Sequence, residues 1–168
     1  MDEKLTIPTE LKHKPVISVE DYANIDSHHF PATDVRALSL GLAQWNDRGK
    51  VDISAKVWRH SGERWSRQSE ELPIHRVIDL SIVIAKALEY FREAYRYPAL
   101  YDGEKPEIAR VGLEGDAFTM KVCTDNKLID EDIKLFYDVL SKQDEQLSEH
   151  LALLARTLNE LGYGNTKR

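Results

Sequence analysis

Hydrophobic and polar residues alternate along residues 51–60, where every second side chain is apolar. This is the period of a strand with one buried face. Ser61-Gly62 then gives a turn signal, and we expect residues 64–68 to return as the paired strand. Residues 16–19, which read Val-Ile-Ser-Val, predict a further short strand.

The predicted hairpin brings aromatic and basic side chains into register. With Ser61-Gly62 as the loop, Trp58 lies directly opposite Trp65, and Lys56 lies opposite Arg67. An aromatic pair of this kind contributes about 0.2–1 kcal/mol and helps to fix the register. A slip of one residue would turn the paired side chains to opposite faces of the sheet.

Helical spacing is found in residues 31–46, where apolar side chains recur every three or four positions and predict a helix. These side chains are Val35, Leu38, Leu42 and Trp45. Gly41 interrupts the pattern, and a glycine at such a position predicts a close packing partner.

Residues 73–97 form the strongest predicted helix. Nine of the twelve residues from Val77 to Leu88 are apolar, so we expect a central helix that is buried on most sides. Pro73 suits the first helical turn. Tyr97 is expected to end the helix, because the residue before a proline avoids helical backbone angles.

The C-terminal part predicts a second hairpin and two helices. Residues 108–113 and 117–123 alternate as strands around a turn at Glu114-Gly115-Asp116, and residues 125–140 have helical spacing. Ser141 with Asp144 resembles a capping box that begins a last helix, which Gly162 ends. Its leucines are spaced four and three apart: Leu147, Leu151, Leu154, Leu158 and Leu161.

Together these elements predict an α+β fold, with a small antiparallel sheet of one or two hairpins packed against a long central helix and two C-terminal helices. A chain of 168 residues predicts a single globular domain. Residues 1–15 are polar overall and contain two prolines, so we expect a loose N-terminal arm.

Composition narrows the class of protein. The net charge of −6 makes nucleic-acid binding unlikely, because such binding needs a basic surface. The single cysteine, Cys123, excludes an internal disulfide and suits a reducing compartment. The first residues do not resemble a signal peptide, and the longest apolar run is too short to span a bilayer. We therefore expect a cytoplasmic protein without a membrane partner.

Charge is unevenly distributed along the chain. Residues 47–68 contain six basic and three acidic side chains, whereas residues 125–150 contain three basic and eight acidic ones. Two solvated faces of opposite sign would explain this distribution. Alternatively, the two faces meet across a subunit contact or steer a partner.

The candidate catalytic residues open the predicted central helix. His75 and Asp79 are four residues apart and therefore share a helix face, and Arg76 is three residues from Asp79. A carboxylate that orients an imidazole is the basic unit of general-base catalysis. The alternative is a polar network that satisfies a partly buried Asp79.

The candidate ligand-binding residues are Lys56, Trp58, Trp65 and Arg67 on one face of the predicted hairpin. Two indoles and two cations on one face would bind a small anionic or aromatic ligand through charge-assisted and cation–π contacts. The alternative is that the tryptophans pack under a helix, with the cationic stems covering their rings.

Other chemistry is weakly indicated. A loop with Asp26, His28 and His29 lies near Asp34, but adjacent loop histidines are commonly exposed, and we predict no metal site. Cys123 at a strand end is expected to be a buried structural cysteine rather than a nucleophile. The sequence contains no glycine-rich phosphate loop and identifies no cofactor.

The segment from Leu38 to His60, and the following segment from Trp65 to Pro73, resemble a family of small bacterial proteins known only as a domain of unknown function. The similarity continues through His75-Arg76 and through residues 123–126. The resemblance implies a bacterial cytoplasmic setting. It implies no activity, cofactor or catalytic residue.

The sequence predicts a non-enzymatic binding or assembly module that forms a homodimer. The leucine seam from Leu147 to Leu161, the tyrosines near the end of the central helix and the divided charge favour this interpretation. The alternative is a small hydrolase-like enzyme that uses His75 and Asp79, with Arg67 or Arg76 holding an anion. Whether the protein is an enzyme is left open.

Overall fold

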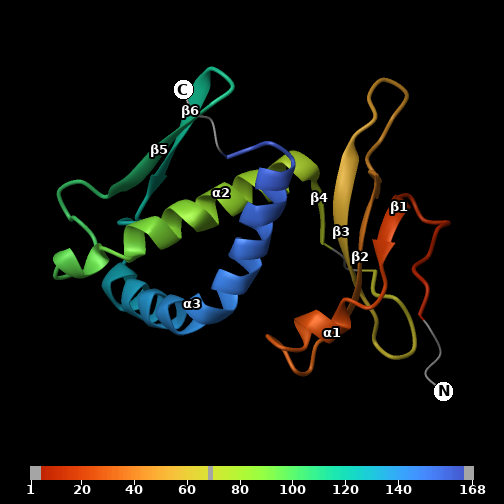
Figure 1. Cartoon of the computed structure of the whole chain (residues 1–168), viewed down its shortest axis with the longest axis horizontal. Helices are drawn as coiled ribbons and strands as arrows, with labels where there is room; N and C mark the ends of the chain where they lie inside the picture. Colours follow the sequence, from red (N-terminus) through yellow and green to blue (C-terminus); the bar gives the residue numbers. More distant parts are fainter. Residues whose placement is uncertain (1–4, 68–69, 165–168) are drawn as a thin grey trace. The chain divides into compact units, whose positions relative to one another are not determined.

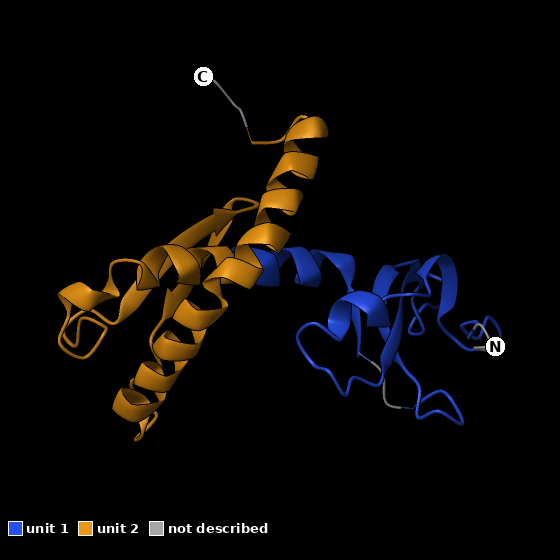
Figure 2. Ribbon diagram, turned by 60° about the horizontal axis from the view of Figure 1, so that its bottom comes forward, with its two compact units in different colours: residues 1–82 blue, residues 83–168 orange. Residues whose placement is uncertain are grey.

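The structure is a computed structural model that describes residues 5–67 and 70–164. The chain divides into two compact units, residues 1–82 and 83–168 (Figures 1 and 2). Each unit is described by itself below. The prediction that the chain forms one domain stays a prediction.

Unit 1 (residues 1–82) contains a four-stranded antiparallel sheet in the order β1-β2-β3-β4, with a short helix α1 (Ala23–Asp26) after β1 (Figure 1). The strands are β1 (Lys14–Val19), β2 (Val35–Leu42), β3 (Ile53–Arg59) and β4 (Glu70–Pro73). The strands predicted at residues 16–19 and 51–60 are confirmed.

The helix predicted for residues 31–46 is wrong, because this segment contains strand β2. Buried and more exposed residues alternate along it, as in a strand with one covered face. The covered face consists of small residues such as Ala37, Ser39 and Gly41, while Leu38 and Leu40 lie on the other face. The sequence of β2 therefore lacks the usual strand pattern, in which large apolar residues on the covered face alternate with polar residues on the other face.

Gly41 has the close packing partner that was predicted for it, although Gly41 lies in strand β2 and not in a helix. A Cβ atom at Gly41 would lie only 2.1 Å from the carbonyl oxygen of Lys14 and 2.7 Å from the Cα of Pro15. Glycine is therefore required where the chain enters β1 and crosses β2.

Strand β3 pairs with β2 and β4. Of the predicted return strand at residues 64–68, Gln68 lies outside the described residues, and Ser66 donates one backbone hydrogen bond to the Arg59 carbonyl. Lys56 lies opposite Glu71, not opposite Arg67, and the predicted return strand contributes one isolated bridge between His60 and Trp65. The buried face of β3 is the one that contains Ser54 and Lys56. The predicted hairpin register is therefore wrong.

The N-terminal arm is not loose over its described part. Ile7 is buried against Ala37 and Trp58, and His13 is 1% exposed. The polar composition of residues 1–15 concealed these two anchoring side chains. Residues 5–13 are called the N-terminal arm below.

Helix α2 (Ile74–Phe91) confirms the predicted helix, although it ends before a short 3₁₀ turn, η1 (Ala94–Arg96). The expectation that it is buried on most sides is wrong. Its buried residues are Leu88 and Phe91, whereas Ile78, Leu80 and Ile84 are about half exposed. An apolar sequence allows burial, but a packing partner must also be present.

In unit 2 (residues 83–168), strands β5 (Glu107–Leu113) and β6 (Asp116–Lys121) form the predicted second hairpin. Its two-residue loop has positive φ at Glu114 (56°) and Gly115 (78°), as a type I′ turn requires. That turn matches the right-handed twist of the two strands, so the local sequence is enough to specify the hairpin.

A single helix, α3 (Ile129–Glu160), replaces the two predicted C-terminal helices. Ser141 and Asp144 lie inside it, because no proline or glycine interrupts residues 129–160. The predicted stop is confirmed, since Gly162 has a φ of 95° directly after the helix. The α+β class is also confirmed.

The core of unit 2 forms where the end of α2 and the start of α3 meet the β5–β6 hairpin. Its fully buried members are Phe91, Ala94, Val122 and Ile133. Tyr90, Tyr137 and Ile108 pack around them. None of the described helices is long and apolar enough to cross a membrane.

Candidate functional site

The predicted catalytic residues lie at the start of helix α2. His75 and Arg76 are exposed, Asp79 is partly buried, and no hydrogen bond or ion pair joins them among the described residues. The pKa of the Asp52 carboxyl is lowered chiefly by the hydrogen bond that Trp45 donates to it, with smaller contributions from Lys50 and His75. Catalysis by His75 and Asp79 stays a prediction.

Three of the four predicted ligand-binding residues come together. The Nζ atom of Lys56 lies 3.8 Å from the ring centroid of Trp58, and the rings of Trp58 and Trp65 meet edge to face at 5.9 Å. Arg67 is exposed and lies outside this group. Because Trp58 is 1% and Lys56 is 8% exposed, these residues do not form an open platform. Ligand binding by them stays a prediction.

Trp58 and Lys56 belong to a buried polar cluster that sequence reasoning missed. We call it the His13 cluster, and it consists of His13, Ser39, Ser54, Lys56, Trp58 and Glu71. The N-terminal arm supplies the histidine, and strands β2, β3 and β4 supply the rest. The only signal in the sequence was the polar character of one face of β3.

Hydrogen bonds place His13 between two serines. Its Nε2 lies 2.9 Å from the Ser39 Oγ, and its Nδ1 lies 2.9 Å from the Ser54 Oγ. The Ser39 hydroxyl also accepts a hydrogen bond of 2.8 Å from the Trp58 Nε1. Ser39 can therefore donate its proton to Nε2 while Nδ1–H donates to Ser54, so a neutral imidazole satisfies all three side chains.

Two opposite charges are buried beside this imidazole. An Oε1 atom of Glu71 lies 2.8 Å from the Nδ1 of His13 without the alignment of a hydrogen bond, and Lys56 is the cross-strand partner of Glu71. Burial lowers the pKa of His13, and Glu71 opposes that change. Burial also lowers the pKa of Lys56.

The His13 cluster contains the residue types of a serine nucleophile site, but its geometry does not favour that chemistry. In such a site the carboxylate accepts the Nδ1 proton of the histidine. Here Nδ1 is aligned with Ser54 instead of Glu71. The Ser39 hydroxyl is buried, and none of the clefts described below reaches it. The cluster fastens the N-terminal arm to the sheet.

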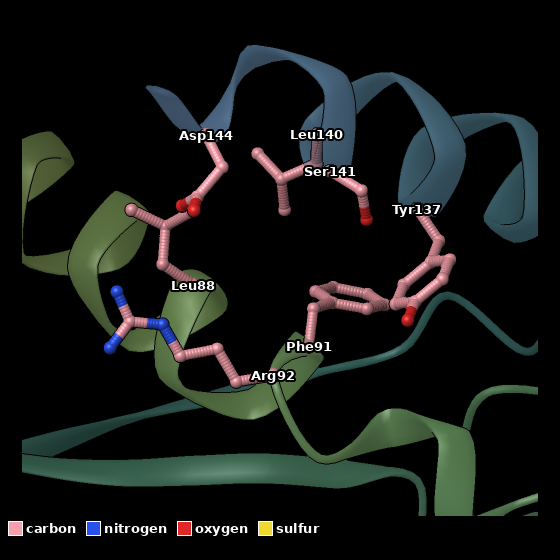
Figure 3. A pocket seen from close by; sticks show the side chains of 7 residues that line it. All are labelled: Leu88, Phe91, Arg92, Tyr137, Leu140, Ser141 and Asp144. Atoms are coloured by element: carbon pink, nitrogen blue, oxygen red, sulfur yellow. The ribbon is translucent and has the colours of Figure 1, made fainter. Parts of the chain in front are cut away.

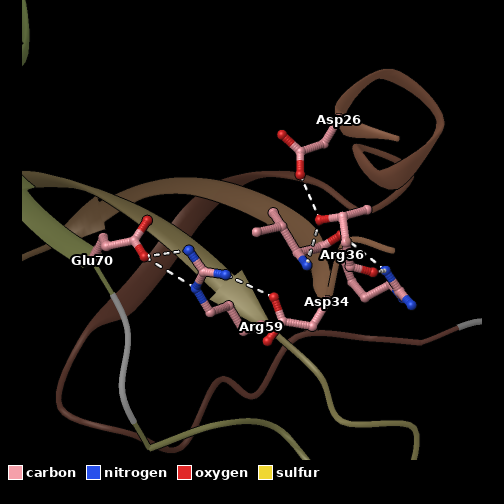
Figure 4. A network of polar contacts seen from close by, with 7 residues as sticks. Asp26, Asp34, Arg36, Arg59 and Glu70 are labelled. Atoms are coloured by element: carbon pink, nitrogen blue, oxygen red, sulfur yellow. Dashed lines mark hydrogen bonds and ion pairs between the residues drawn. The ribbon is translucent and has the colours of Figure 1, made fainter. Parts of the chain in front are cut away.

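A second polar group lines an open cleft of about 510 Å³ in unit 1, which we call the Arg59 cleft. Figure 4 shows the polar contacts of this group. Arg59 donates to the Asp34 Oδ1 through Nη1 at 2.7 Å. It also donates to the Glu70 Oε1 through Nε at 3.0 Å and Nη2 at 2.6 Å. These carboxylates raise the pKa of Arg59 further above its usual value. The guanidinium of Arg59, on β3, is thus held between Glu70 on β4 and Asp34 in the loop that precedes β2.

The α1 side of the Arg59 cleft is held by Thr33. Its Oγ1 donates a hydrogen bond of 2.5 Å to the Asp26 Oδ2 and accepts one of 3.0 Å from the Val35 N–H. Arg36 donates to the carbonyls of Thr33 and Val35 (Figure 4). These bonds fix the loop between α1 and β2, next to Phe30, which lines the cleft together with Tyr22.

A smaller cleft of about 160 Å³ lies between α2 and α3 in unit 2 (Figure 3). Leu88 and Phe91 line it from α2, and Tyr137 and Leu140 line it from α3. Arg92, Ser141 and Asp144 complete the lining, so the cleft combines apolar core residues with polar side chains.

Helix α3 carries an apolar stripe that the polar residues 141–146 interrupt, and the two halves of the stripe have different surroundings. In the first half, Ile133, Tyr137 and Leu140 pack into the core of unit 2. In the second half, the leucine seam continues the stripe, and Leu154, Leu158 and Leu161 are 44%, 40% and 68% exposed. The second half therefore leaves much of its apolar face in solvent.

The remaining candidates do not assemble into sites in the described part of the chain. No group of three or more His, Cys, Asp or Glu side chains there is arranged to hold a metal ion. Cys123 is exposed, so the expectation of a buried cysteine is wrong. It follows strand β6 after Val122, whose side chain occupies the core instead.

Comparison with known proteins gives a family but no activity. The model of a family of unknown function (DUF6530) matches residues 5–163. No curated protein and no solved structure matches the chain. The family description assigns no residue a role.

Proposed function

The chain belongs to the family of unknown function DUF6530, and we propose that it is a non-enzymatic assembly module that forms a homodimer through the second half of α3. The leucine seam is the observation that supports this proposal. Five leucines over 15 residues form one stripe, and that length of helix spans roughly 21 Å at about 1.5 Å per residue.

A second copy of the chain suits this stripe for two reasons. The seam has the spacing of facing helices, and Leu147 lies seven residues after Leu140, on the helix face that packs into the core of unit 2 in the first half of α3. The residues flanking the seam are also uncharged or weakly charged: Ser148, His150, Ala155 and Thr157. Two identical helices can therefore approach without repulsion between like carboxylates or ammonium groups.

The proposal includes a reducing compartment in a bacterial cell. An exposed thiol at Cys123 supports it, because exposed free thiols persist best where disulfides do not form. Thiol titration of protein purified without reductant tests this part. We expect one free thiol per chain, and a disulfide-linked pair in freshly lysed cells would contradict it.

Native mass spectrometry of Leu154→Lys tests the dimer interface. The chain has a mass of 19.3 kDa, so monomer and dimer are resolved directly. We expect a dimer for the wild type and a monomer for Leu154→Lys, because the new charge would be buried in the seam. Ala152→Lys places the same charge on an exposed part of α3 outside the seam and should remain dimeric. A dimer that survives Leu154→Lys would show that the copies meet elsewhere.

A further inference from the structure

We propose that the Arg59 cleft binds a small organic amine, with its apolar or aromatic body inside the cleft and its ammonium group at the acidic rim. This site is independent of the leucine seam. It also lies apart from the tryptophan face, for which the sequence predicted a small anionic or aromatic ligand.

The size and lining of the cleft suit a small molecule. Its volume of about 510 Å³ lies within the roughly 300–1,000 Å³ typical of ligand pockets. Leu38 and Val57, from adjacent strands, supply apolar lining, and Tyr22 and Phe30 supply aromatic lining from the α1 segment. Phe30 is 68% exposed, which leaves its ring available to a ligand.

The charge of the cleft selects a cation. Of the described residues that line it, three are carboxylates and one is a guanidinium, which leaves a net charge of −2. Arg59 already donates to Asp34 and Glu70, so its own charge is offset. A ligand carboxylate would meet this excess of negative charge, whereas an ammonium group would be attracted to it.

The aromatic lining supports the same ligand class. Ammonium groups bind over the faces of aromatic rings, and Tyr22 and Phe30 line the cleft from the same chain segment as Asp26. Burial and the nearby Asp26 raise the pKa of Tyr22, so its phenol stays neutral. An arylalkylamine could therefore contact a ring and a carboxylate at once.

Three probes of similar size and different charge test the proposal: phenethylamine, 2-phenylethanol and 3-phenylpropanoate. Each is titrated into the full-length protein, and backbone amide shifts are followed by two-dimensional NMR. We expect shifts at Thr33, Val35 and Val57, with phenethylamine binding at least about fivefold tighter than the alcohol and the acid binding weakest. Equal binding of amine and alcohol, or shifts confined to other residues, would overturn the proposal. So would the absence of shifts at millimolar amine.

Two substitutions separate charge from shape. Asp26→Asn keeps an oxygen that can accept from Thr33 but removes one negative charge, and it should reduce the amine-to-alcohol preference at least about twofold. Asp138→Asn makes the same change on an exposed part of α3 and should leave the preference unchanged. Phe30→Ala should weaken binding of all three probes. Unchanged binding in both Asp26→Asn and Phe30→Ala would contradict the site.

Discussion

Gly41 and His13 determine how the N-terminal arm lies on the sheet of unit 1. Gly41 allows the backbone at Lys14 to cross β2, and His13 then reaches Ser39 and Ser54. A buried imidazole with both nitrogens hydrogen-bonded is far more favourable than one without partners. Each residue therefore makes a separate prediction about stability.

Gly41→Ala should lower the free energy of unfolding by about 1–3 kcal/mol, because its Cβ would overlap the backbone of Lys14. Gly49→Ala is the matched control, since a Cβ there meets no atom within 4 Å. Urea denaturation monitored by tryptophan fluorescence measures both variants. Equal stability of the two variants would contradict the described crossing.

The titration of His13 should make stability depend on pH. Burial lowers the pKa of His13 in the folded protein, whereas the unfolded histidine keeps a value near 6.5. Below about pH 6.5 the unfolded state therefore binds the proton first, and the free energy of unfolding should fall as the pH falls. Lys56 and Glu71 are the other titratable groups that face this imidazole.

Urea denaturation of His13→Gln between pH 5 and 8 checks this prediction. The amide can still hydrogen-bond to a serine but does not titrate, so the slope of stability with pH below 6.5 should become smaller than in the wild type. His28→Gln replaces an exposed histidine and should retain the wild-type slope. An unchanged slope in His13→Gln would show that His13 is not the group responsible.

Helix α3 shows how a local signal and a long-range packing pattern differ. The Ser141–Asp144 pair has the sequence of a capping box, and residues 141–146 are all polar, but the helix runs through them without a break from Ile129 to Glu160. A serine inside a helix is less favourable than alanine, whereas a serine that caps a helix stabilises it.

Ser141→Ala therefore distinguishes one helix from two. For the continuous helix we expect unchanged stability or a gain of up to about 0.5 kcal/mol. A helix that begins at Ser141 would lose about 1 kcal/mol through removal of its cap. Thermal unfolding followed by circular dichroism measures the difference, and a clear loss would contradict the single helix.

Elements defined by neighbouring residues could be predicted from the sequence, as the β5–β6 turn at Glu114-Gly115 and the stop at Gly162 show. Strand β2 could not be predicted in this way, because its covered face carries small residues such as Gly41. Gly41 has to be small because the backbone of Lys14 and Pro15 packs directly against it, a contact that only the fold creates. The His13 cluster and the Arg59 cleft join segments far apart in the sequence. Only the fold brings those residues together, so spacing along the chain could not reveal them.

The molecule as a whole consists of a sheet unit with buried polar side chains and a helical unit. In the helical unit, apolar residues of α3 extend beyond the part of the helix that packs into the core. The sheet unit contains the His13 cluster and the Arg59 cleft. The helical unit ends in the leucine seam, in which Leu154, Leu158 and Leu161 are 44%, 40% and 68% exposed. Large apolar surfaces in solvent mark sites of association, and the seam is therefore the feature on which the assembly function rests.

Sedimentation equilibrium of the wild-type protein over a range of concentrations tests that function most directly. The account predicts a reversible monomer–dimer equilibrium whose dimer has twice the chain mass of 19.3 kDa. The dimer fraction should rise with concentration and depend little on salt, because the contact is apolar. A single species of 19.3 kDa at every concentration would contradict the assembly function.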